Sequence, residues 1–122
     1  EFCVALTFDA AFVDAVCYSG CFPMAQSICE EPVMLVKLHK ERSIMEDIAH
    51  KLHIEKKTRK LARRYEVTLD TAFEQVVEKV WAQHGHNWLF PVLARTFKRM
   101  HDANGSGEFR ASVHSVEVWK QG

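Results

Sequence analysis

The residues best suited to binding or chemistry form a basic run, KKTRKLARR, at positions 56 to 64. Its six cations are Lys56, Lys57, Arg59, Lys60, Arg63 and Arg64. At 100° per residue on a helix they fall within an arc of about 160°, and Leu61 lies outside it. Such an arc is either a solvated helix face or a surface for phosphates. Because neighbouring acids are few, we expect a positive potential and salt-sensitive binding of nucleic acid.

The distribution of charge agrees with a basic surface. The 122 residues carry a formal net charge of zero, but residues 37 to 64 hold ten Lys or Arg and four Asp or Glu, which is +6, so the remainder carries −6. An apolar content of 48% with 26% charged residues is typical of a soluble globular chain and argues against intrinsic disorder.

Trp88 is the aromatic residue best placed to contact a base. It lies in Asn87-Trp88-Leu89-Phe90-Pro91, a loop between two predicted helices. A large aromatic in such a loop is either a plug over the core or a platform on which an unpaired base stacks. The basic run favours the platform.

Histidine and cysteine side chains could hold a metal, but their spacing is not that of a metal site. His84-Gly85-His86 has no second pair close in sequence, and Cys17 and Cys21 are four apart rather than three. We therefore expect no metal and no cofactor, and surface histidines. The four cysteines, at positions 3, 17, 21 and 29, are interpreted as free thiols in a reducing compartment. A metal-dependent enzyme built on the Cys/His set stays an alternative.

Short strands and helices must position these residues. Apolar runs predict strands at residues 2–8, 33–38 and 65–69 and in the last segment. Capping and periodicity predict helices after Asp9, from Ser43, from near Glu55, from Asp70 or Thr71 to His84-Gly85, and from Pro91. Residues 21–31 are expected to form a loop. The pattern is α+β, with a flexible link at residues 103–110 as its one boundary.

The last segment, HSVEVWKQG, predicts a strand in which Val116 and Val118 face one way and Glu117 and Trp119 the other. We expect this strand to lack a partner within the chain, and we interpret the chain, which starts at Glu1, as incomplete. No stretch approaches the roughly 18 to 20 apolar residues of a membrane helix, and no secretory signal is recognisable.

Five blocks, in order over most of the chain, resemble the leucyl/phenylalanyl-tRNA protein transferase family. They are Tyr18-x-Gly20-Cys21-Phe22-Pro23-Met24, Leu52-His53-Ile54 with the basic run, Val67-Thr68-Leu69-Asp70-Thr71-Ala72-Phe73 with Val76-Val77, Asn87-Trp88-Leu89 in place of Thr-Trp-Ile, and His114-Ser115-Val116-Glu117-Val118-Trp119. The chain departs from the family after Met24, where a Trp-Trp-Ser-Pro stretch is replaced. This departure leaves the amino-acid specificity open.

The resemblance implies a division of the chain. Residues 1–102 would be a small N-terminal α/β domain of tRNA-binding type, residues 103–110 a linker, and residues 111–122 the first strand of an acetyltransferase-like (GNAT-type) catalytic domain. The catalytic groups are expected beyond Gly122, so that this chain alone would be inactive.

The resemblance also implies an activity: transfer of Leu or Phe from aminoacyl-tRNA to the N-terminal Arg or Lys of an acceptor protein, which marks that protein for degradation. The expected enzyme is cytoplasmic, monomeric when full length, and free of membrane partners. The six cations would hold tRNA phosphates, Trp88 would stack near the terminal adenosine, and His114, Glu117 and Trp119 are candidate pocket residues. A non-catalytic tRNA- or RNA-binding module is the alternative.

Overall fold

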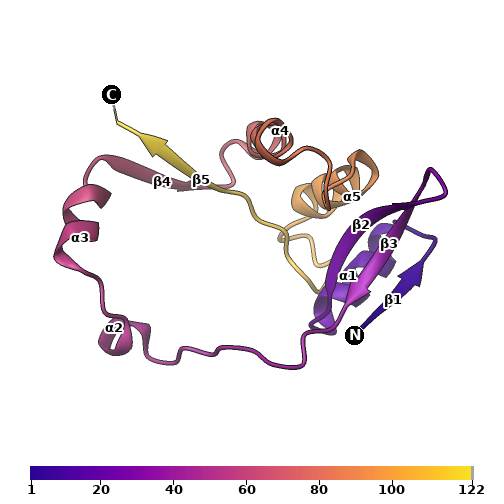
Figure 1. Cartoon of the computed structure of the whole chain (residues 1–122), viewed down its shortest axis with the longest axis horizontal. Helices are drawn as coiled ribbons and strands as arrows, with labels where there is room; N and C mark the ends of the chain where they lie inside the picture. The colour runs from indigo at the N-terminus through magenta and orange to yellow at the C-terminus, as the bar shows by residue number, and fades with distance from the viewer. Residues whose placement is uncertain (122) are drawn as a thin grey trace.

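A computed structural model describes residues 1–121, which form short strands and helices in mixed order (Figure 1). The strands are β1 (Phe2–Ala5), β2 (Phe22–Ile28), β3 (Glu31–Lys37), β4 (Tyr65–Leu69) and β5 (Val116–Lys120). The helices are α1 (Ala10–Tyr18), α2 (Ile48–Lys51), α3 (Lys56–Ala62), α4 (Phe73–His84) and α5 (Pro91–Asp102). The α+β class predicted from the sequence is confirmed, with two small sheets.

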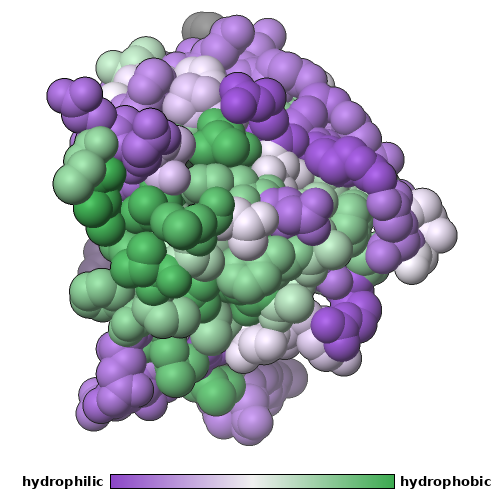
Figure 2. Space-filling view, turned by 90° about the vertical axis from the view of Figure 1, so that its right-hand side faces the viewer, coloured by the Kyte–Doolittle hydropathy of each residue, from purple (hydrophilic) through white to green (hydrophobic). Residues whose placement is uncertain are grey.

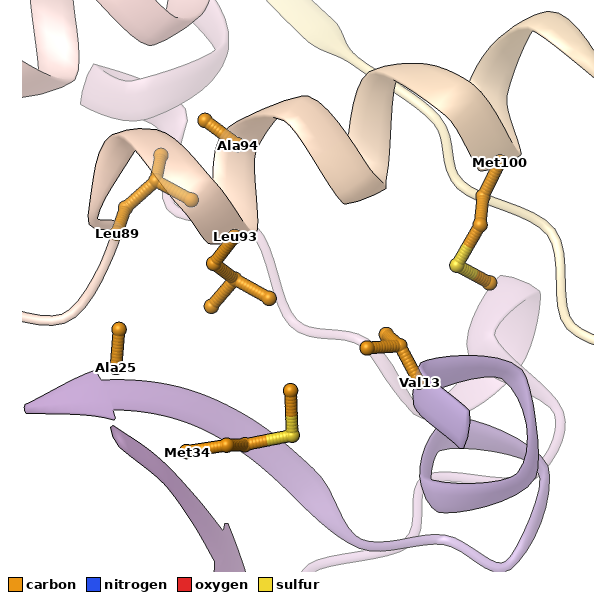
Figure 3. Close-up of a cluster of buried hydrophobic side chains, with 7 residues drawn as sticks. All are labelled: Val13, Ala25, Met34, Leu89, Leu93, Ala94 and Met100. Carbon is orange, nitrogen blue, oxygen red and sulfur yellow. The ribbon is translucent and has the colours of Figure 1, made fainter. Parts of the chain in front are cut away.

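The main core lies where α1 and α5 meet the three-stranded sheet, whose order is β1-β3-β2 with antiparallel pairs. Its buried side chains converge from both helices, the sheet and the loop before α5 (Figure 3): Val13, Ala25, Met34, Leu89, Leu93, Ala94 and Met100. The loop that carries Trp88 is also bound to the sheet directly. The Trp88 carbonyl accepts a hydrogen bond of 2.8 Å from the N–H of Ala25 in β2.

Local signals in the sequence predict α1 and α5 well. The Asp9 carboxylate caps α1 by accepting bonds from the N–H groups of Ala11 (2.9 Å) and Phe12 (3.4 Å). Pro91 starts α5, where its missing N–H costs nothing. Both predictions are confirmed.

Two predictions for residues 21–47 are wrong. Residues 22–28 form β2 rather than a loop, and they pair with β3 through a tight turn at Cys29 and Glu30, whose φ angles are +50° and +68°. Turns of this kind usually contain Asn or Gly, so the sequence gives no local signal that predicts the hairpin. No helix starts at Ser43, because Ile44 is 81% exposed and the segment has no core to pack against.

The last segment has a partner strand, contrary to expectation. β5 pairs with β4 in an antiparallel ribbon, with Val67 opposite Val118 and Thr68 opposite Glu117. The side chains alternate between two faces as predicted, but the buried face is the polar one. Val67 and Val118 are 66% and 63% exposed, whereas Glu117 is 4% exposed.

The chain is open rather than closely packed. Its accessible surface is 9272 Å² for 14.1 kDa, against about 6,700 Å² expected for a compact protein of this mass. The segment from residue 38 to α3 forms an arc away from the core, and the β4–β5 ribbon projects at the opposite end from the three-stranded sheet (Figure 1). The side of the molecule that bears this sheet shows a broad hydrophobic area (Figure 2). In residues 1–121, no helix has the length and apolar character that crossing a membrane requires.

Removal of a core side chain should destabilise the chain, and removal of a ribbon side chain should not. Leu93 is 0% exposed and Leu69 is 57% exposed. We expect Leu93→Ala to lower the free energy of unfolding by about 2 to 5 kcal/mol, measured by urea denaturation. Leu69→Ala, a matched deletion, should change it by less than about 0.5 kcal/mol. Equal losses would contradict the placement of the core.

Candidate functional site

An apolar cavity of about 700 Å³ lies between β2, α4 and the segment that leads into β5. Its walls are mostly aliphatic and aromatic: Cys17, Gly20, Cys21, Phe22, Pro23, Phe73, Val76, Val77, Val80, Trp88, Leu89, Phe97, Val113 and Val116. A few polar residues complete the lining: His39, Arg42, Ser112, His114 and Ser115. An apolar cavity of this size with few polar groups is typical of a site for a small ligand.

Trp88 is fixed in the wall of this cavity. Its ring is tilted by 44° against Phe22 at 5.5 Å between centroids, and it packs against the buried core. The neighbouring Leu89 carbonyl accepts a 2.6 Å bond from the Trp81 indole N–H. Trp88 thus closes one side of the core and also lines the cavity, so the two interpretations of this residue are compatible. Base stacking stays a prediction.

Arg42 brings a positive charge to the cavity from the arc segment. Its guanidinium donates to the Gly20 carbonyl, and a Cβ at position 20 would lie 3.3 Å from two guanidinium nitrogens. Gly20 also has φ of +78°, a conformation that favours glycine. The φ angle is the reason that position 20 favours glycine, and a side chain there would also press on the Arg42 guanidinium. The remaining Arg42 donors are available to an anion.

Asp70 holds two histidines at the point where β4 ends. Its Oδ2 accepts from His114 Nδ1 at 2.7 Å, and its Oδ1 lies 3.2 Å from His101 Nε2 and accepts from the Ser115 N–H at 2.9 Å. The His114 bond, then the Ser115 and His101 bonds, lower the pKa of Asp70, so its carboxylate is ionised at neutral pH. Because a carboxylate can only accept, His114 must carry its hydrogen on Nδ1.

Glu117 is the centre of a second hydrogen-bond network. Its carboxylate accepts from three hydroxyls, those of Ser115 (2.6 Å), Thr68 (2.6 Å) and Thr71 (2.9 Å), and from the Ala72 N–H at 3.2 Å. These bonds, those from Ser115 and Thr68 first, lower the pKa of Glu117 from 4.5 to about 2.

The helix cap assigned to Asp70 or Thr71 is therefore wrong. The N-cap of α4 is Ala72, which has no side-chain acceptor, and the acceptor for its N–H comes from Glu117 on another strand. Asp70 instead adopts φ of +58° and directs its carboxylate to the histidines and Ser115. Glu117 thus stabilises the start of α4 and fixes β5 against β4.

Side-chain acceptors also fasten the chain between α5 and β5. Asp14, 7% exposed, accepts from the N–H groups of Arg110 (2.9 Å) and Ala111 (2.7 Å). Asn104 bonds the Val113 carbonyl at 2.6 Å and the Val113 N–H at 3.2 Å. The predicted link at residues 103–110 therefore leads into a well-anchored segment that forms one wall of the cavity.

The predicted basic helix is present as α3, although its last two cations lie beyond it. Arg63 is the C-cap, and Arg64 follows. In the part of the chain that the structure describes, none of the six cations forms an ion pair with an acidic side chain; Arg59 donates only to the Ile54 carbonyl at 3.1 Å. The helix lies in the arc, apart from the cavity (Figure 1).

The structure separates the three predicted pocket residues. His114 lines the cavity with Trp88, whereas Glu117 and Trp119 line a second groove of about 530 Å³ between α4 and β5. The Trp119 indole N–H donates to the Thr68 hydroxyl at 2.8 Å, which joins it to the Glu117 network. Sequence reasoning did not select Arg42, Asp70 or His101, because their partners are remote along the chain.

The cysteines have their thiols free in the structure, and Cys17 and Cys21 line the cavity. Burial first, and the Asp14 carboxylate second, raise the pKa of the Cys17 thiol, which is therefore protonated at neutral pH. Among residues 1–121, no three His, Cys, Asp or Glu side chains are grouped so that they could hold one metal ion.

Comparison with known proteins gives one consistent family. Residues 47–122 match the profile of the leucyl/phenylalanyl-tRNA protein transferase family. The transferase of that name from Desulfatibacillum aliphaticivorans is 33% identical over 81 residues, which is 62% of this chain and 32% of the relative. The one from Azoarcus sp. (strain BH72) is 36% identical over 63 residues, 49% of this chain and 24% of the relative. No solved structure matches significantly.

Loss of the Glu117 charge should flatten the acid dependence of stability. The folded-state pKa of Glu117 is lowered to about 2, so its contribution is complete above the ordinary pKa of about 4.5 and is lost as the pH falls towards 2. We expect Glu117→Gln to lower the free energy of unfolding at pH 7 and to reduce its decline between about pH 5 and pH 2, measured by urea denaturation.

Glu66→Gln is the matched control, since Glu66 is an exposed carboxylate on the same ribbon. It should leave the acid dependence as in the wild type. If Glu117→Gln also left it unchanged, the network would not hold the carboxylate in the way described.

Proposed function

The chain belongs to the leucyl/phenylalanyl-tRNA protein transferase family, and we propose that it carries the tRNA-binding part of an enzyme that transfers Leu or Phe to proteins. The donor is aminoacyl-tRNA and the acceptor is the α-amino group of an N-terminal Arg or Lys, which marks the protein for degradation in the cytoplasm. The chain spans about a third and a quarter of the length of the two relatives. The activity of the whole enzyme is therefore part of this proposal.

The proposed reaction is the aminolysis of an ester. The amine must be unprotonated when it attacks, and the carbonyl oxygen must be stabilised as negative charge develops on it. The amine nitrogen forms a bond to the ester carbonyl carbon, the bond from that carbon to the ribose oxygen breaks, and a proton passes from the amine to the leaving ribose oxygen. This exchange balances without a metal or cofactor. We assign the catalytic groups to residues beyond Gly122 and give this chain the task of holding the donor.

The cavity is the observation that carries the proposal. It combines an aromatic wall at Trp88, a cation at Arg42 and a fixed histidine at His114. A nucleotide offers a base that stacks, a phosphate that pairs with a guanidinium, and hydroxyls that form hydrogen bonds. We place the terminal adenosine of the charged tRNA in this cavity. Glu117 lies outside it and is assigned to the support of its wall, whereas Trp119, which lines the second groove, is assigned no contact with the nucleotide.

The cations of α3 suit the body of the tRNA. They are exposed, they carry no acidic partner among the described residues, and they lie on the arc, away from the cavity. Contacts of this kind position a nucleic acid without reading its sequence. A tRNA is long enough to touch both regions.

The β4–β5 ribbon supports the proposed start of a GNAT-type catalytic domain over residues 111–122, after a first domain at 1–102 and a linker at 103–110. Two-stranded ribbons are marginal alone, and one face of this ribbon exposes Val67, Leu69, Val116 and Val118. Further strands of a catalytic sheet would cover it. Because β4 and β5 come from both proposed domains, the ribbon would join them.

A non-catalytic RNA-binding module is the second candidate. The residues that favour it are again the cations of α3 and Trp88, because basic side chains bind RNA phosphates and aromatic side chains stack on RNA bases. A transfer assay with radiolabelled Leu-tRNA and a protein with an N-terminal Arg distinguishes the two: the module binds tRNA and yields no labelled protein even when the chain is joined to the remaining length of a relative.

Removal of the Trp88 ring should weaken binding of Leu-tRNA. Stacking of one base contributes about 1 to 3 kcal/mol, so Trp88→Ala should raise Kd by about 5- to 150-fold. Trp119→Ala, the same truncation outside the cavity, should have less than about a 3-fold effect. We would measure Kd by fluorescence anisotropy of labelled tRNA. Equal effects of the two substitutions would remove the cavity from the tRNA site.

Neutralising α3 should change the salt dependence of binding. Replacing Lys56, Arg59, Lys60 and Arg63 by Gln removes up to four phosphate contacts, so the slope of log K against log salt should become shallower by about 3 to 4. Reversal of these charges to Glu should abolish binding.

The control replaces Lys98 and Arg99 by Gln. These cations already pair with Asp102, at 2.5 Å for the Lys98 pair, and with Glu108. The slope of log K against log salt for this control variant should stay close to that of the wild type. An unchanged slope for the α3 variant would exclude α3 from the interface.

A further inference from the structure

The Nε2 atom of His114 has not yet been given a ligand contact in the site. His114 lines the cavity, and only its Nδ1 is engaged, at 2.7 Å from Asp70. Within residues 1–121, the structure records no hydrogen bond to its Nε2. The side chain is 46% exposed, so a ligand can reach it.

The tautomer of this ring is determined by its partner. Asp70 is ionised, accepts the Nδ1 hydrogen, and is itself held by the Ser115 N–H at 2.9 Å. A neutral imidazole with its hydrogen on Nδ1 has a lone pair on Nε2 and accepts a hydrogen bond there. His114 is part of the cavity lining and Asp70 is not, and since Nδ1 is directed to Asp70, we take the Nε2 edge of the ring as the one that faces the ligand.

The acceptor is suited to a hydroxyl group. A nucleotide bound with its base on Trp88 and its phosphate near Arg42 has its ribose between them, and the ribose hydroxyls are its strongest donors. On the terminal adenosine of a tRNA, whose 5′-oxygen carries the phosphodiester, esterification of the 3′-oxygen leaves the 2′-hydroxyl as the only free ribose hydroxyl. This group is also the one by which a protein distinguishes RNA from DNA.

We propose that His114, oriented by Asp70, accepts a hydrogen bond from the 2′-hydroxyl of the terminal nucleotide through Nε2 and thereby selects an RNA end. The inference rests on the proposed function, because it assumes that the cavity takes the end of a tRNA. It adds a specificity residue, His114, and a positioning residue, Asp70. Neither role requires a proton to leave the histidine.

The test compares two short fluorescein-labelled RNAs that end in CCA and differ only in the last sugar, which is ribose in one and 2′-deoxyribose in the other. Affinities are measured by anisotropy at one fixed pH for all samples. One hydrogen bond corresponds to about a 3- to 10-fold preference for the ribose end. The ratio of the two affinities is taken on one protein sample, so partial unfolding lowers both and leaves the ratio intact.

Three variants test whether the preference for the ribose end arises from His114. His114→Asn keeps a donor where Nδ1 lies and lacks the Nε2 acceptor, so its ratio should fall to about one. His114→Gln retains a polar atom near the Nε2 position and should keep part of the preference. His101→Asn, the matched control, removes the other histidine on Asp70, which lies outside the cavity, and should keep the full ratio.

Binding with a ratio of one in the wild type, or a ratio that His114→Asn leaves unchanged, would overturn this inference and leave the tRNA site standing. Failure of the folded wild-type chain to bind either RNA would overturn the proposed function and this inference with it.

Discussion

The arrangement of this chain depends on carboxylate and amide side chains that hold its last segment in place. Within residues 110 to 117, Ala111 and Val113 pack against the core. In addition, Asp14, Asn104, Asp70 and Glu117 accept bonds from the backbone or hydroxyls of that segment and of the elements beside it. Each buried acceptor that lost its donors would carry the cost of desolvation without compensation. The segment is therefore confined to one path, along α4 and into the ribbon with β4.

This confinement produces the cavity. The apolar stripe of α4 faces residues 113 to 116 on one side and the Trp88 loop on the other, so the anchored segment becomes a wall. Asp70 both anchors the segment and orients a cavity side chain, because its carboxylate accepts the Ser115 N–H and also bonds the His114 ring. The basic helix α3 is separate from this site, which suits a partner that is large, anionic and single-stranded at its end.

The sequence predicts the elements whose signals are local. Three features depend on residues that are neighbours in the sequence: the Asp9 cap of α1, the limits of β4 and the Pro91 start of α5. The sequence does not predict the β2–β3 hairpin, because Cys29 and Glu30 occupy a positive-φ turn without the residues usual there. Of the site, Trp88 and the cations could be selected by type. Asp70 bonds His114, and Glu117 bonds Thr68 and the Ala72 N–H, all more than forty residues away along the chain. Such pairs leave no trace in a local pattern, and a helix cap was the nearest local explanation for Asp70.

The central claim is that the cavity, and not α3 alone, receives the end of the RNA. The most direct measurement is an ¹⁵N NMR titration of the chain with a short RNA ending in CCA. The account predicts saturable shifts of the Trp88 indole N–H and of the backbone amides of residues 113 to 116, together with shifts along α3. Shifts confined to α3, with the Trp88 and Ser115 signals unmoved at saturation, would contradict it.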